Sequence, residues 1–378
     1  MSTQVEVPTA GAVLTIQQLN YILNGACIMG SGGGGPYTVG KQVLQYIGNR
    51  PVNLVSAASV PDSVSMAVSA FVGSPDAAAN QVLDFSVATT AFNALAKTVN
   101  ASFGCVLPGE VGAGNSLIPM AVAVDNKIPV IDAAGAPRAI PGFLMVSYAA
   151  AGIPASPMVL ADKNNQVTIN CANAIADPVT RGVISGNVFP EDAGIAFWTM
   201  NGKILKSPGV AITGTTTQAM VIGQALANAV GSGQDPVLAV MQNMEKPNFV
   251  LCTGTIKDSS EATSGGFDFG TVVISADDGS EVTIYNQNEN LIAFSNRSYV
   301  PLAMGPDLIC YLTTKGQVFS NADLKTLPKD AKIAVIGVPA RVMRIPFILN
   351  QFAIALAGIG YAGSYVPIEK LNAQQIAA

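Results

Sequence analysis

Five glycines fill six consecutive positions, from Gly30 to Gly35, between two segments that are predicted to be helices. The capping-box sequence Thr15-Ile16-Gln17-Gln18 opens an apolar pattern of helical spacing that stops at Gly30. After Pro36, residues 37–47 are again helix-like, and a strand is expected after Pro51. Glycines here either let the two helices pass closely and adopt positive φ, or expose backbone as a cradle for an anion or ligand. The loop residues for such a cradle are Gly32, Gly33, Gly34 and Gly35.

The rest of the chain predicts an α/β class fold in two domains, the default for 378 residues. Strand-like apolar runs cover 66–72, 103–107, 128–131 and 158–161, alternating with helix-like stretches such as 88–99 and 117–124. Such alternation is typical of a three-layer α/β domain, which we assign to residues 1–165.

The pattern changes after about residue 165. Helical segments over 217–230 and 236–244 precede short alternating runs at 250–256, 271–275, 281–285 and 290–294. These runs predict antiparallel strands, so residues 166–378 are expected to form a β-rich, α+β second domain. The Ser, Thr, Gly and Asp content of Gly254–Gly270 predicts a long mobile loop there.

Charge is scarce: 11% of residues are Asp, Glu, Lys or Arg, the net charge is −5, and hydrophobic residues make up 49%. No basic block is present to follow a phosphate backbone, which argues against nucleic acid as a partner. A neutral surface favours association, so the chain itself is the expected partner, in a homo-oligomer or polymer. A well-packed monomer with a bland polar surface is the alternative.

The five scattered cysteines form no CxxC pair and predict buried thiols of a reducing compartment. Residues 1–30 show no signal-peptide pattern, so a cytoplasmic location is the default, with an extracellular one left open. The apolar run from Ile345 to Tyr361 is interrupted by Asn350-Gln351 and is expected to be a buried helix or strand pair, not a membrane span.

The chain contains no histidine, which excludes histidine-dependent triads and imidazole metal sites. No metal and no cofactor is expected. The spacing from Gly35 to Lys41 is similar to a phosphate-binding P-loop, but Gln42 replaces the magnesium-binding hydroxyl and the loop follows a helix. Acid–base chemistry would fall to Glu110, Asp132 or Glu289, each set among small or amide residues that could orient a carboxylate or that simply form caps and turns.

At these residues the chain resembles the S-methyl-thiohydantoin desulfurase family. The matching landmarks, in order along the chain, are Gly30–Pro36, Glu110–Ser116, Asp132–Pro141, Gly265–Phe267, Gln287–Leu291, Pro306–Ile309 and Ile333–Ala340. The resemblance implies an N-terminal α/β domain, a C-terminal β-rich domain and hydrolytic sulfur release from rings related to hydantoins.

The chain departs from the family pattern at positions where charge is expected. Ala134 and Gly142 replace two carboxylates, and no histidine follows Met145. Pro137 replaces the glycine before the arginine, and Gly254-Thr255 replaces a Gly-Lys pair. These losses remove groups that a hydrolase uses to activate water and to stabilise negative charge.

Two functions therefore follow from the sequence, and the first is favoured. In the first, the chain would be a catalytically silent family member that self-associates as a filament or scaffold. Alternatively, it hydrolyses or desulfurises a small cyclic amide, with Glu110 or Asp132 as base and Arg138 as oxyanion partner. The glycine loop would then hold the ring or its carboxylate. The further ligand contacts in that case are Asn115, Gln287, Asn288 and Glu289. Ligand binding without turnover is a third option.

Overall fold

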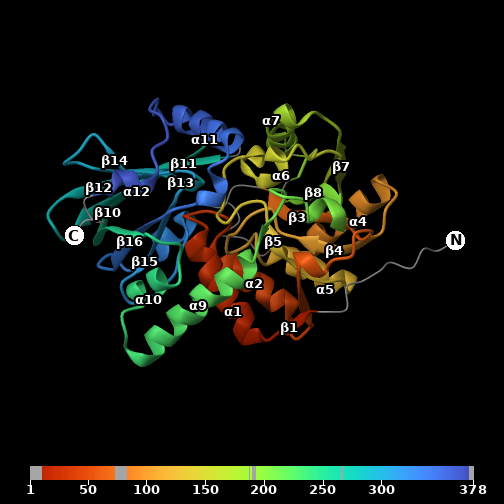
Figure 1. The fold of residues 1–378 in the computed structure, drawn as a ribbon, viewed down its shortest axis with the longest axis horizontal. Helices are drawn as coiled ribbons and strands as arrows, with labels where there is room; N and C mark the ends of the chain where they lie inside the picture. The colour runs from red at the N-terminus through yellow and green to blue at the C-terminus, as the bar shows by residue number, and fades with distance from the viewer. Residues whose placement is uncertain (1–10, 73–82, 187, 190–192, 265–266, 374–378) are drawn as a thin grey trace.

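Two β-sheets with their covering helices make up the molecule (Figure 1). A computed structural model describes residues 11–72, 83–186, 188–189, 193–264 and 267–373. The helices are α1 (Ile16–Met29), α2 (Tyr37–Ile47), α4 (Ser86–Thr98), α5 (Ile118–Asn126), α6 (Ser147–Ala150), α7 (Asn173–Ser185), α8 (Gly202–Leu205), α9 (Thr215–Ser232), α10 (Pro236–Gln242), α11 (Pro346–Gly358) and α12 (Ile368–Leu371).

The first sheet is mixed. Its strands are β1 (Ala12–Leu14), β2 (Val52–Ser56), β3 (Ser65–Val72), β4 (Phe103–Leu107), β5 (Val130–Ala134), β6 (Met158–Ala161), β7 (Gln166–Ile169), β8 (Ala193–Asn201) and β9 (Ile212–Thr213). The order is β1-β2-β5-β4-β3-β8-β6-β7, with β9 beside β5. Strands β2, β5, β4 and β3 run parallel, and every residue of β4 is buried, as expected for a strand covered on both faces.

The second sheet is antiparallel throughout and lies at the opposite end of the molecule (Figure 1). Its strands are β10 (Phe249–Ser264), β11 (Phe267–Ala276), β12 (Glu281–Gln287), β13 (Glu289–Ser295), β14 (Pro301–Met304), β15 (Leu308–Thr313) and β16 (Lys332–Val338). Alternate residues, such as Val272 and Ile274 on β11 and Val282 and Ile284 on β12, are buried in its core. The predicted pairing of an α/β domain with a β-rich domain is confirmed.

Local signals predicted several helices well. Helix α1 begins after Thr15, whose side chain and that of Gln18 form the predicted capping box. It packs tightly on α9: a β-carbon added at Gly25 would lie 1.8 Å from the carbonyl oxygen of Ala219. Helix α11 covers most of the apolar run 345–361, and within the described ranges no helix is long and apolar enough to cross a membrane.

One sequence expectation needs correction. The segment Gly254–Gly270 is not a loop: its described residues belong to the β10–β11 hairpin, paired from Gly254 with Ala276 to Ser264 with Phe267. Backbone hydrogen bonds hold this exposed ladder, so it needs no apolar alternation and resembles a loop in sequence. Strands β7, β8 and β9 belong to the first sheet, so the chain passes from the first sheet to the second between Thr213 and Phe249.

The glycine loop lies where the two sheets meet. The carbonyl oxygen of Gly34 accepts the backbone N–H groups of Gly114 (2.9 Å) and Asn115 (3.1 Å), and that of Ser31 accepts the N–H of Asn290 (2.8 Å). Gly34 has a φ of 74°, and a β-carbon there would lie 2.5 Å from the Cα of Gly112. Glycine is therefore required at Gly34 for both its conformation and its contact.

Candidate functional site

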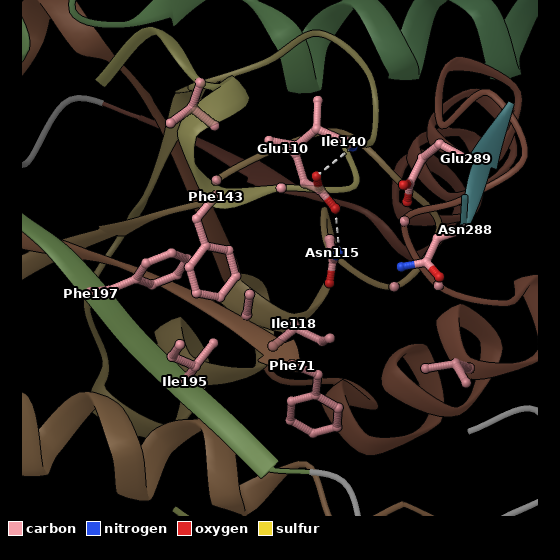
Figure 2. A pocket seen from close by; sticks show the side chains of 18 of the residues that line it. Phe71, Glu110, Asn115, Ile118, Ile140, Phe143, Ile195, Phe197, Asn288 and Glu289 are labelled. Carbon is pink, nitrogen blue, oxygen red and sulfur yellow. Dashed lines mark hydrogen bonds between the residues drawn. The ribbon is translucent and has the colours of Figure 1, made fainter. Parts of the chain in front are cut away.

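A cavity of about 140 Å³ opens beside the glycine loop, between the first sheet and the turn that joins β12 to β13 (Figure 2). One end is polar and is formed by Glu110, Asn115, Asn288 and Glu289 with the backbone of the loop. The other walls are apolar: Phe71, Ile118, Phe143, Ile195, Phe197 and Trp198. A cavity of about 150 Å³ takes one benzene-sized ring, so this one has room for a single small ring.

Glu110 follows β4, and two donors fix its carboxylate. The side-chain amide of Asn115 donates to Oε1 (2.6 Å), and the backbone N–H of Ile140 donates to Oε2 (2.8 Å). Desolvation by the surrounding protein raises the pKa of Glu110 to about 7, against the lowering effect of these hydrogen bonds and of Arg138. Glu110 therefore titrates near neutral pH, where a general base works best.

Glu289 is the first residue of β13 and is 3% exposed. Its Oε1 packs against Gly33, where an added β-carbon would lie 2.1 Å away, and its buried Oε2 has no hydrogen-bond partner among the residues described. Burial and the nearby charge of Glu110 hold the pKa of Glu289 well above its usual range, in spite of the opposing charge of Arg138. Figure 2 shows its carboxyl oxygens pointing toward the side of the cavity on which Glu110 lies.

Asn288 adds a hydrogen-bond donor to the polar end. Its backbone is left-handed, with a φ of 58°, and its Oδ1 accepts the N–H of Asp268 (2.7 Å). The amide nitrogen points the other way, toward Asn115 (Figure 2). In this turn the side-chain oxygen of Asn288 is therefore occupied by the N–H of Asp268, and its side-chain nitrogen faces the cavity.

Arg138 does not line the cavity. Its buried guanidinium group donates to four main-chain carbonyl oxygens, those of Ala139 (2.9 Å), Asn290 (2.8 Å), Pro306 (3.3 Å) and Asp307 (2.7 Å). These bonds hold together the segments that carry Ile140 and Glu289. The guanidinium that the sequence suggests as an oxyanion partner therefore lies outside the cavity, and four of its N–H donors are directed at main-chain carbonyl oxygens.

Asp132 lies in β5 and is not among the residues that line the cavity. Its Oδ1 accepts the N–H groups of Thr216 (2.9 Å) and Thr217 (3.1 Å), and its Oδ2 accepts the hydroxyl of Thr217 (2.5 Å). It therefore caps the N-terminus of α9, which was the alternative considered from sequence. The other predicted contacts divide: Gly34, Gly35, Asn115, Asn288 and Glu289 line the cavity, whereas Gly32, Gly33 and Gln287 do not.

The aromatic wall was missed by the sequence analysis. Phe71 is on β3 and Phe197 is on β8. Strand β8 pairs antiparallel with β3, and no local sequence pattern predicted that pairing. Phe143 lies close to a family landmark, two residues after the end of Asp132–Pro141. Within the described ranges, no group of three or more Asp, Glu or Cys side chains could hold a metal ion, and all five cysteines are free thiols.

The fold is that of a two-domain protein, one domain α/β and the other antiparallel β, with a cavity where the two sheets meet. The chain belongs to the S-Me-THD-like family: residues 17–171 match its N-terminal domain and residues 172–367 its C-terminal domain. The crystal structure of a protein from Chromobacterium violaceum has the same fold, with a TM-score of 0.81 and 27% identity over 94% of this chain and 100% of that one. No curated protein matches this chain.

Proposed function

We propose that this chain binds a small uncharged cyclic amide, of the hydantoin or thiohydantoin kind, in the cavity and hydrolyses it. One observation carries the proposal: Glu110, Glu289, Asn115 and Asn288 line the polar end of a cavity that has room for a single ring. Apolar walls with a few convergent polar groups and carboxyls of raised pKa are typical of ligand sites. Family membership supports the ring chemistry, while fold alone would not.

The chemistry assigned to the site is a hydrolytic displacement. Glu110 takes a proton from water as the water oxygen bonds to the ring carbon that carries sulfur. The electron pair of the ring C=N bond moves to the ring nitrogen, which takes the second proton of the water. The C–S bond then breaks as the new C=O bond forms, and the proton held by Glu110 passes to the leaving thiolate. The amide nitrogen of Asn288 is placed to donate to the ring oxygen as negative charge develops there.

The test is turnover of an S-methyl-thiohydantoin by the purified protein, followed by release of methanethiol with a thiol reagent. We expect Glu110→Gln to abolish release, because it removes the base. Asp132→Ala is the matched control, since Asp132 caps α9 outside the cavity, and it should retain release. Failure of any ring of this class to bind at millimolar concentration would rule the proposal out.

A catalytically silent, self-associating scaffold is the second candidate, and the outer face of α11 favours it. Phe347 (39% exposed) and Ile354 (61% exposed) are seven residues apart and therefore share one face of that helix. An apolar exposed face in a chain with 11% charged residues is suited to contact with a second copy. Sedimentation velocity at several concentrations tests this: wild type should associate and Ile354→Glu should not. A wild-type monomer at every concentration would exclude it.

A further inference from the structure

We propose that Glu110 and Glu289 hold one proton between them, that the proton resides on Glu289, and that the cavity therefore selects an uncharged ligand with a hydrogen-bond acceptor beside an N–H donor. The ligand selection rests on the proposed function. The location of the proton does not, because it concerns the free protein.

The hydrogen bonds of the two carboxyls are unequal. Both oxygens of Glu110 accept N–H donors, from Asn115 and Ile140, and such bonds stabilise a charged carboxylate. The backbone N–H of Gly34 is a donor to the carboxyl of Glu289, but its Oε2 atom is buried without a partner among the described residues. A buried anionic oxygen without a donor is strongly unfavourable, whereas a carboxylic acid O–H there would offer a hydrogen bond to the cavity.

The buried charges around the pair support the same assignment. Arg138 acts electrostatically on both Glu110 and Glu289, and Arg181 acts on Glu289. Arg181 forms an ion pair with Asp177 at 2.9 Å, so its charge is already balanced by that carboxylate. Arg138 is therefore the cation that remains to balance Glu110 and Glu289. Its single positive charge can compensate only one of the two carboxylates. Two ionised carboxylates in one low-dielectric site repel each other, which keeps one of them protonated.

This arrangement presents a pattern of donors and acceptors to a ligand. Glu289 donates its O–H to a ligand acceptor, and Glu110 accepts a ligand N–H. An N–H next to a carbonyl, as in a cyclic amide, satisfies both. A carboxylate ligand would meet the charge of Glu110, and no Lys or Arg is among the described residues that line the cavity. The polar groups at this site therefore favour a neutral ring over a ring carboxylate.

The first arm of the test measures thermal stability against pH without ligand. A carboxyl whose pKa is raised by folding stabilises the protein at low pH, and this stability is lost as pH rises through the folded pKa. Wild type should therefore melt several degrees lower at about pH 8 than at about pH 5. Glu289→Gln resembles the protonated acid, so it should fold normally and show a smaller slope than wild type, with the remainder due to Glu110 and Asp177.

Glu110→Gln is the matched variant. It should be less stable than Glu289→Gln at about pH 8, because its amide replaces a carboxylate that accepts two N–H donors. The reverse order, or a wild-type slope that persists in Glu289→Gln, would overturn the location of the proton. Asp177, whose pKa is also raised, is present in all three proteins and contributes equally to each.

The second arm measures binding of 2-imidazolidinone, an uncharged cyclic urea whose N–H lies next to a carbonyl, and of cyclopentanecarboxylate by saturation-transfer NMR. Wild type and Glu289→Gln should bind 2-imidazolidinone, and Glu110→Gln should bind it about tenfold or more weakly. Cyclopentanecarboxylate should bind wild type at least about tenfold more weakly than 2-imidazolidinone. Equal binding of the two probes would overturn the selection. If neither probe binds while the pH profiles behave as expected, the proposed function and the ligand selection fail and the proton assignment holds.

Discussion

Glu110 and Asp132 have similar sequence surroundings but different environments in the fold. Both belong to the adjacent strands β4 and β5 or the residues just after them, and both have small residues nearby. Asp132 lies at the N-terminus of α9, and both of its carboxylate oxygens accept hydrogen bonds from the first turn of that helix. Glu110 meets the β12–β13 turn across a cavity and lies opposite a second carboxyl. The comparison shows that the element packed against a carboxylate in the fold decides whether that carboxylate is structural or available for chemistry. The local sequence does not decide it.

The largest effect should come from Arg138→Met, which leaves four carbonyl oxygens without their donor and two buried carboxyls without their cation. We expect a loss of about 3–5 kcal/mol in the free energy of unfolding, measured by urea denaturation. Arg297→Met, which breaks an exposed ion pair with Asp278, is the control and should have a much smaller effect, because solvent screens that pair. Equal losses in the two variants would remove Arg138 from its positioning role.

Gly34→Ala should rank next. The left-handed conformation costs about 1–2 kcal/mol and the clash with Gly112 adds about 1–3 kcal/mol. Gly209→Ala separates the conformational cost from the clash. Gly209 has a φ of 78° and open space around it, so this variant should show the conformational cost alone. Urea denaturation of both variants measures the difference. If Gly34→Ala is no worse than Gly209→Ala, the close approach of the two loops is not required.

Asp132→Ala tests the other side of the comparison. Loss of the cap of α9 should cost about 1–2 kcal/mol in unfolding free energy and leave 2-imidazolidinone binding unchanged. Asp235→Ala is matched to it, since Asp235 caps α10 through the N–H groups of Val237 (2.8 Å) and Leu238 (3.1 Å). Binding that disappears in Asp132→Ala but not in Asp235→Ala would return Asp132 to the functional site.

The smallest effect is expected for Asn115→Leu. This change removes a donor to Glu110 that lowers its pKa, so the pKa should rise above about 7. Because Glu110 then keeps its proton to higher pH in the folded state, stability should fall more steeply between about pH 6 and 8 than in wild type. Melting temperatures across that range check the sign. A shallower slope would mean that Asn115 does not stabilise the charged form.

Much of the fold was predictable from short-range patterns. The capping box at Thr15, the buried strand Phe103–Leu107 and the alternation over Glu281–Gln287 each specify an element by local chemistry. The β10–β11 hairpin and the placement of β8 were not predictable this way. Their hydrogen bonds join residues far apart or carry no apolar pattern, and a single sequence contains no record of which strands pair.

The sequence by itself determined the local elements, the low charge, the absence of histidine and the small set of residues able to do acid–base chemistry. Only the tertiary structure decided which of them meet. Asp132 and Arg138 were committed to a helix cap and to four carbonyl oxygens, while Glu110 and Glu289, 179 positions apart in the sequence, came to face one cavity. The physical reason is that burial and charge compensation depend on the elements that close around a side chain, and those contacts form only when the two sheets pack together.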